Sequence, residues 1–76
     1  MKRFFFDYRT KDQSVYDYQG DEFLSAQSAI EFAHATAQVL THSLSGDWAG
    51  WSIEVRNPEG MKLFSVAVDS AGALAA

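Results

Sequence analysis

Two aspartates, Asp7 and Asp17, are the side chains in this sequence best placed for acid–base chemistry. They lie in neighbouring segments, RFFFDYR and SVYDYQ, whose composition is typical of the paired strands of a hairpin. A loop at residues 11–13 sets the two carboxylates opposite each other, where repulsion is expected to raise one pKa. Such a pair suits proton transfer or the binding of a cation. A loop at residues 10–12 pairs Asp7 with Val15 instead. The alternative interpretation is that both aspartates are solvated strand charges screened by arginines.

The two histidines, His34 and His42, do not form a metal site. At 100° per residue they are separated by about 80° around a helix and by two turns along it, so they cannot share one ion. Cysteine is absent, which excludes disulfides, thiol catalysis and thiolate zinc sites. We therefore predict no metal and no cofactor, and solvated histidines.

Other catalytic patterns are missing from the sequence. Serines are abundant, but none lies in a Gly-x-Ser-x-Gly elbow. Gly46 and Gly50 fit neither of the glycine-rich patterns that bind phosphate. A domain of 76 residues with one helix leaves little room for a substrate cleft and an oxyanion hole. We expect a protein that is not an enzyme.

A larger group of side chains is predicted to share the sheet face that points away from the helix. Mixed apolar and charged faces of this kind are typical of surfaces that meet another protein, including a second copy. The alternative is a binder of single-stranded nucleic acid or of a small ligand, in which bases stack on Phe5 and arginines hold the backbone. The predicted interaction face consists of Arg3, Phe5, Asp7, Arg9, Val15, Asp17, Glu54, Arg56 and Leu63.

The charge distribution disfavours nucleic acid as the partner. The chain has a net charge of −4, and residues 12–55 contain seven acidic residues but no lysine or arginine. The one basic cluster lies in the first eleven residues. Because a duplex-binding surface needs clustered cations, a protein partner or self-association is the better expectation.

The elements that position these residues begin with two strands, at residues 3–9 and 14–19. The first is rich in aromatic residues, and the second alternates, with Tyr16 and Tyr18 on one face. The polar residues TKDQ form the turn between them. The sequence Gly20-Asp21-Glu22 is predicted to end the second strand.

A helix is predicted from about Ser25 to Leu44, with Ser25 as its N-cap and Ser45-Gly46 as its stop signal. Small apolar residues recur with a period of 3.6 and let the helix approach a sheet that carries bulky rings. This stripe comprises Ala26, Ala29, Ile30, Ala33, Ala37, Leu40 and Leu44.

Packing of the helix yields two further expectations. The centre of the stripe, Ala33 and Ala37, is expected to lie against the rings of Phe4, Phe6 or Phe64. Two larger residues, Phe32 and Val39, lie about 100–120° away from the centre of the stripe. Either Trp48 folds back to cover them or they contact a partner.

Two more strands follow, at residues 52–56 and 61–68, joined by the turn Asn57-Pro58-Glu59-Gly60. Odd positions of the first strand and even positions of the second are apolar and are expected to point inward. A four-residue loop predicts the pairs Arg56–Met61, Ile53–Phe64 and Trp51–Val66.

The element order β-β-α-β-β predicts an α+β fold, a two-layer sandwich of one helix on a four-stranded, mainly antiparallel sheet. We expect one domain at residues 1–68 and a flexible, Ala-rich tail at 69–76. No apolar run reaches the roughly 20 residues of a membrane span, and Asp7 interrupts the Phe4–Phe6 run, so no signal-peptide core is predicted. A cytoplasmic location without membrane contact follows as the expectation.

Several segments together resemble a family of small bacterial proteins known only as a domain of unknown function. The resemblance covers residues 3–68 and rests on the strand RFFFDYR, Asp-x-x-Gly at 17–20, the Ala-rich helix, Trp-x-Ile-x-Val at 51–55 and Glu-Gly-x-x-Leu-x-x-Val at 59–66. The chain departs from the family pattern at Asp7, where the family usually has His, and in its first turn, which lacks Asp-Gly pairs. The resemblance implies a similar fold and no established activity.

The predicted function is a non-enzymatic protein-interaction module, in the simplest case a homodimer. A chain of 76 residues without metal or disulfide often recruits a partner to bury more apolar surface. The surface expected to do so is the open sheet face or an edge strand.

Overall fold

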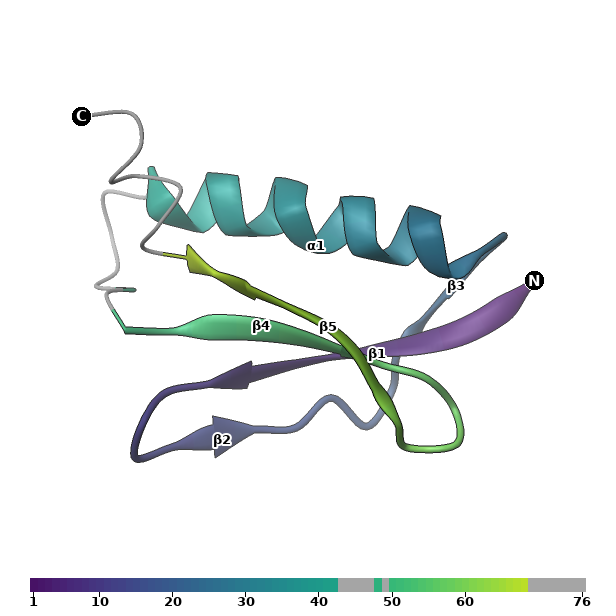
Figure 1. The fold of residues 1–76 in the computed structure, drawn as a ribbon, viewed down its shortest axis with the longest axis horizontal. Coiled ribbons are helices and arrows are strands. Elements are labelled where there is room, and N and C mark those ends of the chain that lie inside the picture. Colours follow the sequence, from purple (N-terminus) through teal and green to yellow (C-terminus); the bar gives the residue numbers. More distant parts are fainter. Residues whose placement is uncertain (43–47, 49, 69–76) are drawn as a thin grey trace.

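The computed structural model describes residues 1–42, 48 and 50–68 of the chain. One helix, α1 (Ala26–Thr41), lies across one face of an antiparallel sheet (Figure 1). The strands are β1 (Lys2–Arg9), β2 (Ser14–Val15), β3 (Asp21–Phe23), β4 (Ser52–Arg56) and β5 (Lys62–Ala67). The predicted α+β class is confirmed. The tail predicted at 69–76 lies outside the described residues.

The sheet has the order β2-β1-β4-β5, and β3 also pairs with β1. The described residues form five strands rather than the predicted four, because the expected strand at 14–19 is split. β2 ends at Val15, and the chain returns to β1 at Asp21, so the Gly20-Asp21-Glu22 segment enters a strand instead of ending one. Gly20 has a φ of 71°, and a Cβ there would lie 2.7 Å from the backbone oxygen of Phe4. Only glycine fits this return.

The first hairpin has neither of the registers considered from sequence. Tyr8 pairs with Val15, which leaves a four-residue loop at 10–13. Thr10 closes this loop, because its N–H donates to the oxygen of Gln13 at 2.8 Å and its hydroxyl accepts from the N–H of Gln13 at 3.0 Å. The two aspartates are therefore not a directly opposed pair.

The second hairpin keeps its predicted turn but not its predicted pairs. Gly60 has a φ of 90°, and its N–H donates to the oxygen of Asn57 at 2.9 Å. Ile53 pairs with Val66 instead of with Phe64, because the register shifts in a bulge next to Val55. The predicted and observed registers of Ile53 differ by two residues, and an even shift keeps every side chain on its face. The inward parity is therefore confirmed.

Helix α1 begins as predicted. The hydroxyl of Ser25 accepts a hydrogen bond from the N–H of Ser28 at 3.2 Å, which caps the first turn. The last helical residue is Thr41. The predicted end at Leu44 and the stop signal at 45–46 lie outside the described residues.

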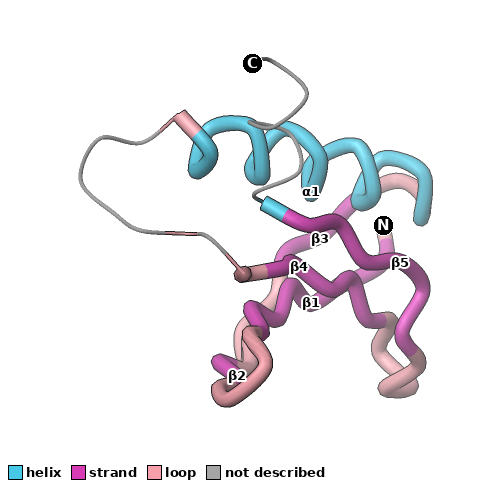
Figure 2. Tube along the Cα trace, turned by 60° about the vertical axis from the view of Figure 1, so that its left-hand side comes forward, coloured by secondary structure: helices cyan, strands magenta, loops and turns pink. Residues whose placement is uncertain are grey.

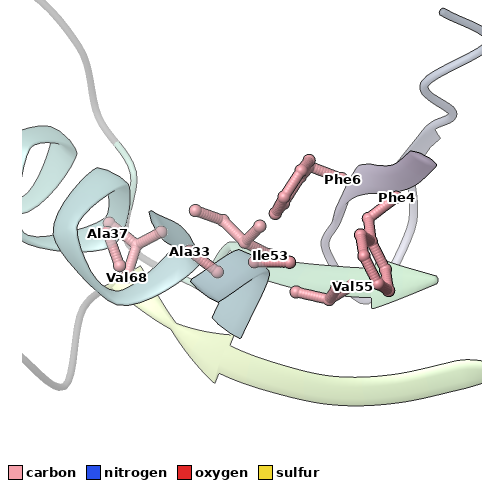
Figure 3. Packing of buried hydrophobic residues seen from close by; sticks show 8 residues of the cluster. Phe4, Phe6, Ala33, Ala37, Ile53, Val55 and Val68 are labelled. Carbon is pink, nitrogen blue, oxygen red and sulfur yellow. The ribbon is translucent and has the colours of Figure 1, made fainter. Parts of the chain in front are cut away.

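The core lies between α1 and the sheet (Figures 2 and 3). Ala29, Ala33 and Ala37 of the stripe are buried against the apolar side chains of β1 and β4 (Figure 3), whereas Ala26, at the start of the helix, is exposed. Phe64 packs against this cluster from β5, so the stripe alanines share one core with the three predicted rings. The buried core residues are Phe4, Phe6, Ala29, Ala33, Ala37, Ile53, Val55 and Val68.

Phe32 is covered by rings of the sheet rather than by Trp48. Its ring centroid lies 5.3 Å from that of Phe6 and 5.5 Å from that of Phe23. The described ring contacts of Trp48 are to Tyr8 and to Trp51. Of the two alternatives considered for Phe32 and Val39, cover by Trp48 is therefore wrong for Phe32, and the two side chains keep 46% and 69% of their surface exposed.

Candidate functional site

Asp7 is buried in an ion pair with Arg56, which comes from the neighbouring strand β4. Its side chain is on the sheet face away from α1, yet the residue is only 3% exposed. Arg56 donates from Nε to Oδ2 at 2.8 Å and from Nη2 to Oδ1 at 3.1 Å. This two-point geometry is the strong form of an arginine–carboxylate contact.

Asp17 takes the place of a strand at the gap between β2 and β3. Its Oδ2 accepts from the N–H of Phe6 at 3.1 Å. Its Oδ1 accepts from the N–H groups of Gln19 and Gly20, both at 3.0 Å. The Asp17 carboxylate thus accepts the hydrogen bond from the Phe6 N–H of β1 that a neighbouring strand would otherwise accept.

The two aspartates and Arg56 form one unit, which we call the aspartate–arginine cluster. The N–H of Asp17 donates to Oδ1 of Asp7 at 2.9 Å. Arg56 donates from Nη2 to the backbone oxygen of Asp17 at 3.1 Å. The cluster therefore ties the 16–20 segment to both β1 and β4.

The pKa values of both aspartates are lowered. Burial by itself raises the pKa of Asp7, but the hydrogen bonds from Arg56 and from the N–H of Asp17 outweigh it. Burial also raises the pKa of Asp17, and three backbone N–H groups together with the charge of Arg56 outweigh it. The raised pKa expected for a directly opposed pair is wrong, since each carboxylate has its own donors.

The other charged residues of the predicted interaction face also have partners within the chain. Glu54 lies 3.5 Å from Arg9 and 3.7 Å from Lys62. Arg3 pairs with Glu22 at 3.1 Å. These ion pairs leave a sheet face whose charges are largely neutralised by one another.

The three apolar residues of the predicted interaction face lie in different surroundings. The ring of Phe5 lies under the guanidinium of Arg56, 4.8 Å from centroid to Cζ. Leu63 lines a cleft of about 480 Å³ with Leu24, near the start of α1. Val15 lies opposite Tyr8, so its side chain is on the helix side of the sheet and not on the predicted face.

A second concave surface was not predicted from the sequence. It is a groove of about 410 Å³ between the flank of α1 and the gap in the sheet edge, and we call it the aromatic groove. The alternating residues at 14–19 predicted one continuous strand with Tyr16 and Tyr18 on one face, and a continuous strand would leave no gap for a groove. The groove is lined by Phe6, Tyr8, Val15, Tyr16, Asp17, Asp21, Phe32 and Thr36.

The histidines are exposed, as predicted. His34 also contacts the ring of Phe64 at a centroid distance of 5.1 Å, and His42 is the C-cap of α1. Within residues 1–42, 48 and 50–68, no three or more His, Cys, Asp or Glu side chains are grouped so that they would hold a metal ion.

Fold and cluster together define an α+β domain in which a carboxylate, instead of a strand, completes one sheet edge. Residues 3–69 match a protein family described as a domain of unknown function (DUF6894), and the chain belongs to this family. No curated protein and no solved structure gave a significant match. In the described ranges, no helix has the length and hydropathy that crossing a bilayer requires.

Proposed function

We propose that this protein is a non-enzymatic interaction module that forms a homodimer through strand β5. The observation that carries the proposal is the difference between the two edges of the sheet. One edge is interrupted between β2 and β3 and closed by Asp17, whereas the other is the six-residue strand β5.

The backbone geometry of β5 leaves groups available for a second strand. The N–H of Val68 donates to the oxygen of Trp51 at 3.0 Å. Because hydrogen-bonded pairs alternate along an antiparallel ladder, the N–H and C=O of Ser65 point away from β4. A strand added at this edge pairs with those groups.

Side chains along β5 restrict where that pairing occurs. Lys62 and the bulge at Leu63 discourage pairing at the start of the strand, as charges and bulges do at protected edges. The segment that follows, residues 64–66 around Ser65, carries no charge. Pairing of two copies there is self-complementary and closes as a two-fold dimer.

The open sheet face is a weaker surface for this purpose. Its charges already satisfy one another, and burying them in an interface costs desolvation. The same pairs occupy Arg3, Arg9 and Arg56, the cations on which binding of nucleic acid would depend. Self-association in the cytoplasm through the β5 edge is therefore the function we favour.

Sedimentation analysis at micromolar to submillimolar concentration tests the proposal. The wild-type chain is expected to sediment as a dimer and Ser65→Pro as a folded monomer, because proline removes an N–H that points away from β4. Ser65→Ala retains the N–H and is the matched control, expected to remain dimeric. A wild-type chain that is monomeric throughout, or a folded Ser65→Pro variant that stays dimeric, overturns the proposal. If Ser65→Pro does not fold, the oligomeric state of the wild-type chain decides: a dimer supports the proposal and a monomer overturns it.

A further inference from the structure

The aromatic groove has a wall of rings that remain open to solvent. Tyr16 is 50% exposed and Phe32 is 46% exposed, and the rings of Phe6 and Tyr8 belong to the same lining. The Phe32 ring packs edge-on against Phe6, with centroids 5.3 Å apart. The groove therefore offers a partly fixed aromatic surface with room for an elongated side chain.

Charge in the groove has one sign. Asp17 and Asp21 belong to its lining, and no cationic side chain does among the residues described. No lysine or arginine occurs between residues 12 and 55, a stretch that supplies β2, β3 and α1. Arg56 is held at Asp7, and none of the described ion pairs involves Asp21.

The negative charge also acts on Tyr8, another residue of the groove lining. Burial and the charge of Asp17 both raise the pKa of Tyr8. Arg56 and three backbone N–H groups already stabilise Asp17, whereas an uncharged apolar occupant would leave Asp21 without an opposite charge and would desolvate its carboxylate at a cost. A side chain with an apolar stem and a cationic head would cover the rings and supply the opposite charge.

We propose that the aromatic groove binds a lysine or arginine side chain presented by a different protein. The aliphatic stem covers the rings, the cationic head lies over an aromatic face, and Asp21 supplies the opposite charge. This site is at the β2 edge of the sheet and does not depend on the proposed dimer through β5. A dimer formed at β5 presents two such grooves.

Amide NMR titration of the isotope-labelled chain with blocked tripeptides tests the site. The probe is acetyl-Leu-Arg-Leu-amide, and its citrulline counterpart has nearly the same shape without the charge. The arginine peptide is expected to shift the amides of Tyr16, Phe32 and Thr36 and to bind about threefold to tenfold more tightly than the citrulline peptide. Equal affinities, or shifts confined to other regions, overturn the proposal.

Two matched pairs of variants locate the contact. Asp21→Asn removes a carboxylate of the groove, whereas Asp12→Asn removes an exposed one in the first turn, outside the groove lining. Tyr16→Ala removes a groove ring, whereas Tyr18→Ala removes a ring that is 88% exposed and lies outside the groove lining. The first member of each pair is expected to weaken the arginine peptide about threefold or more, and the second to change it by less than about 1.5-fold. Equal effects within both pairs mean general charge or ring attraction, which contradicts a defined site.

Discussion

At the residue scale, the aspartate–arginine cluster shows what a sequence can and cannot reveal. The Asp-x-x-Gly pattern at 17–20 signals a turn in which the carboxylate accepts nearby N–H groups, and the structure has those bonds to Gln19 and Gly20. The partnership of Asp7 with Arg56 joins residues 49 positions apart. No local pattern encodes that contact, because it depends on the alignment of β1 with β4.

Acid should destabilise the protein through this cluster. Both folded-state pKa values lie below the ordinary value of an aspartate, about 3.9, so the folded state binds fewer protons than the unfolded state. The stabilisation is complete at pH values about one unit above the unfolded pKa and is lost progressively as the pH falls through the folded-state pKa values. We expect the free energy of unfolding, measured with urea, to decrease below about pH 5. Carboxyl NMR titrations of Asp7 and Asp17 with midpoints at or above 3.9 would contradict this account.

At the element scale, the parts of the fold specified by hydrophobic period were predictable. The alanine stripe fixed the phase of α1, and Ala29, Ala33 and Ala37 are buried in the structure. Strand pairing was less predictable. The bulge beside Val55 shifts the pairing by two residues and keeps each side chain on its face. The first hairpin differs by one residue from either predicted register, which places Val15 on the helix side of the sheet.

A pair of alanine substitutions tests the phase of α1. Ala33 is fully buried in the core, whereas Ala35 is exposed on the other side of the helix. Leucine at position 33 overpacks the core and should cost about 1–3 kcal/mol, or roughly 4–8 °C in Tm for each kcal/mol in a domain of this size. Ala35→Leu, the control, should move Tm by less than about 2 °C. Thermal unfolding followed by circular dichroism measures both, and equal Tm values would show that the helix phase is wrong.

At the scale of the whole molecule, the two edges of the sheet are built differently. The β2 edge is broken, closed by Asp17 and flanked by the acidic aromatic groove. The β5 edge is continuous and uncharged after Lys62. Neither property follows from composition, because both depend on which strands end up outermost. The proposal of one edge for self-association and the other for a cationic partner follows from this asymmetry.

The most direct test of self-association through β5 is a search for contacts between two copies. A mixture of isotope-labelled and unlabelled chains allows NOEs to be recorded only between different molecules. The β5 dimer predicts intermolecular NOEs that link backbone protons of residues 64–66 with the same segment of the other copy. Intermolecular NOEs that arise instead from Arg9, Glu54 and the rest of the open sheet face, or none at submillimolar concentration, would contradict it.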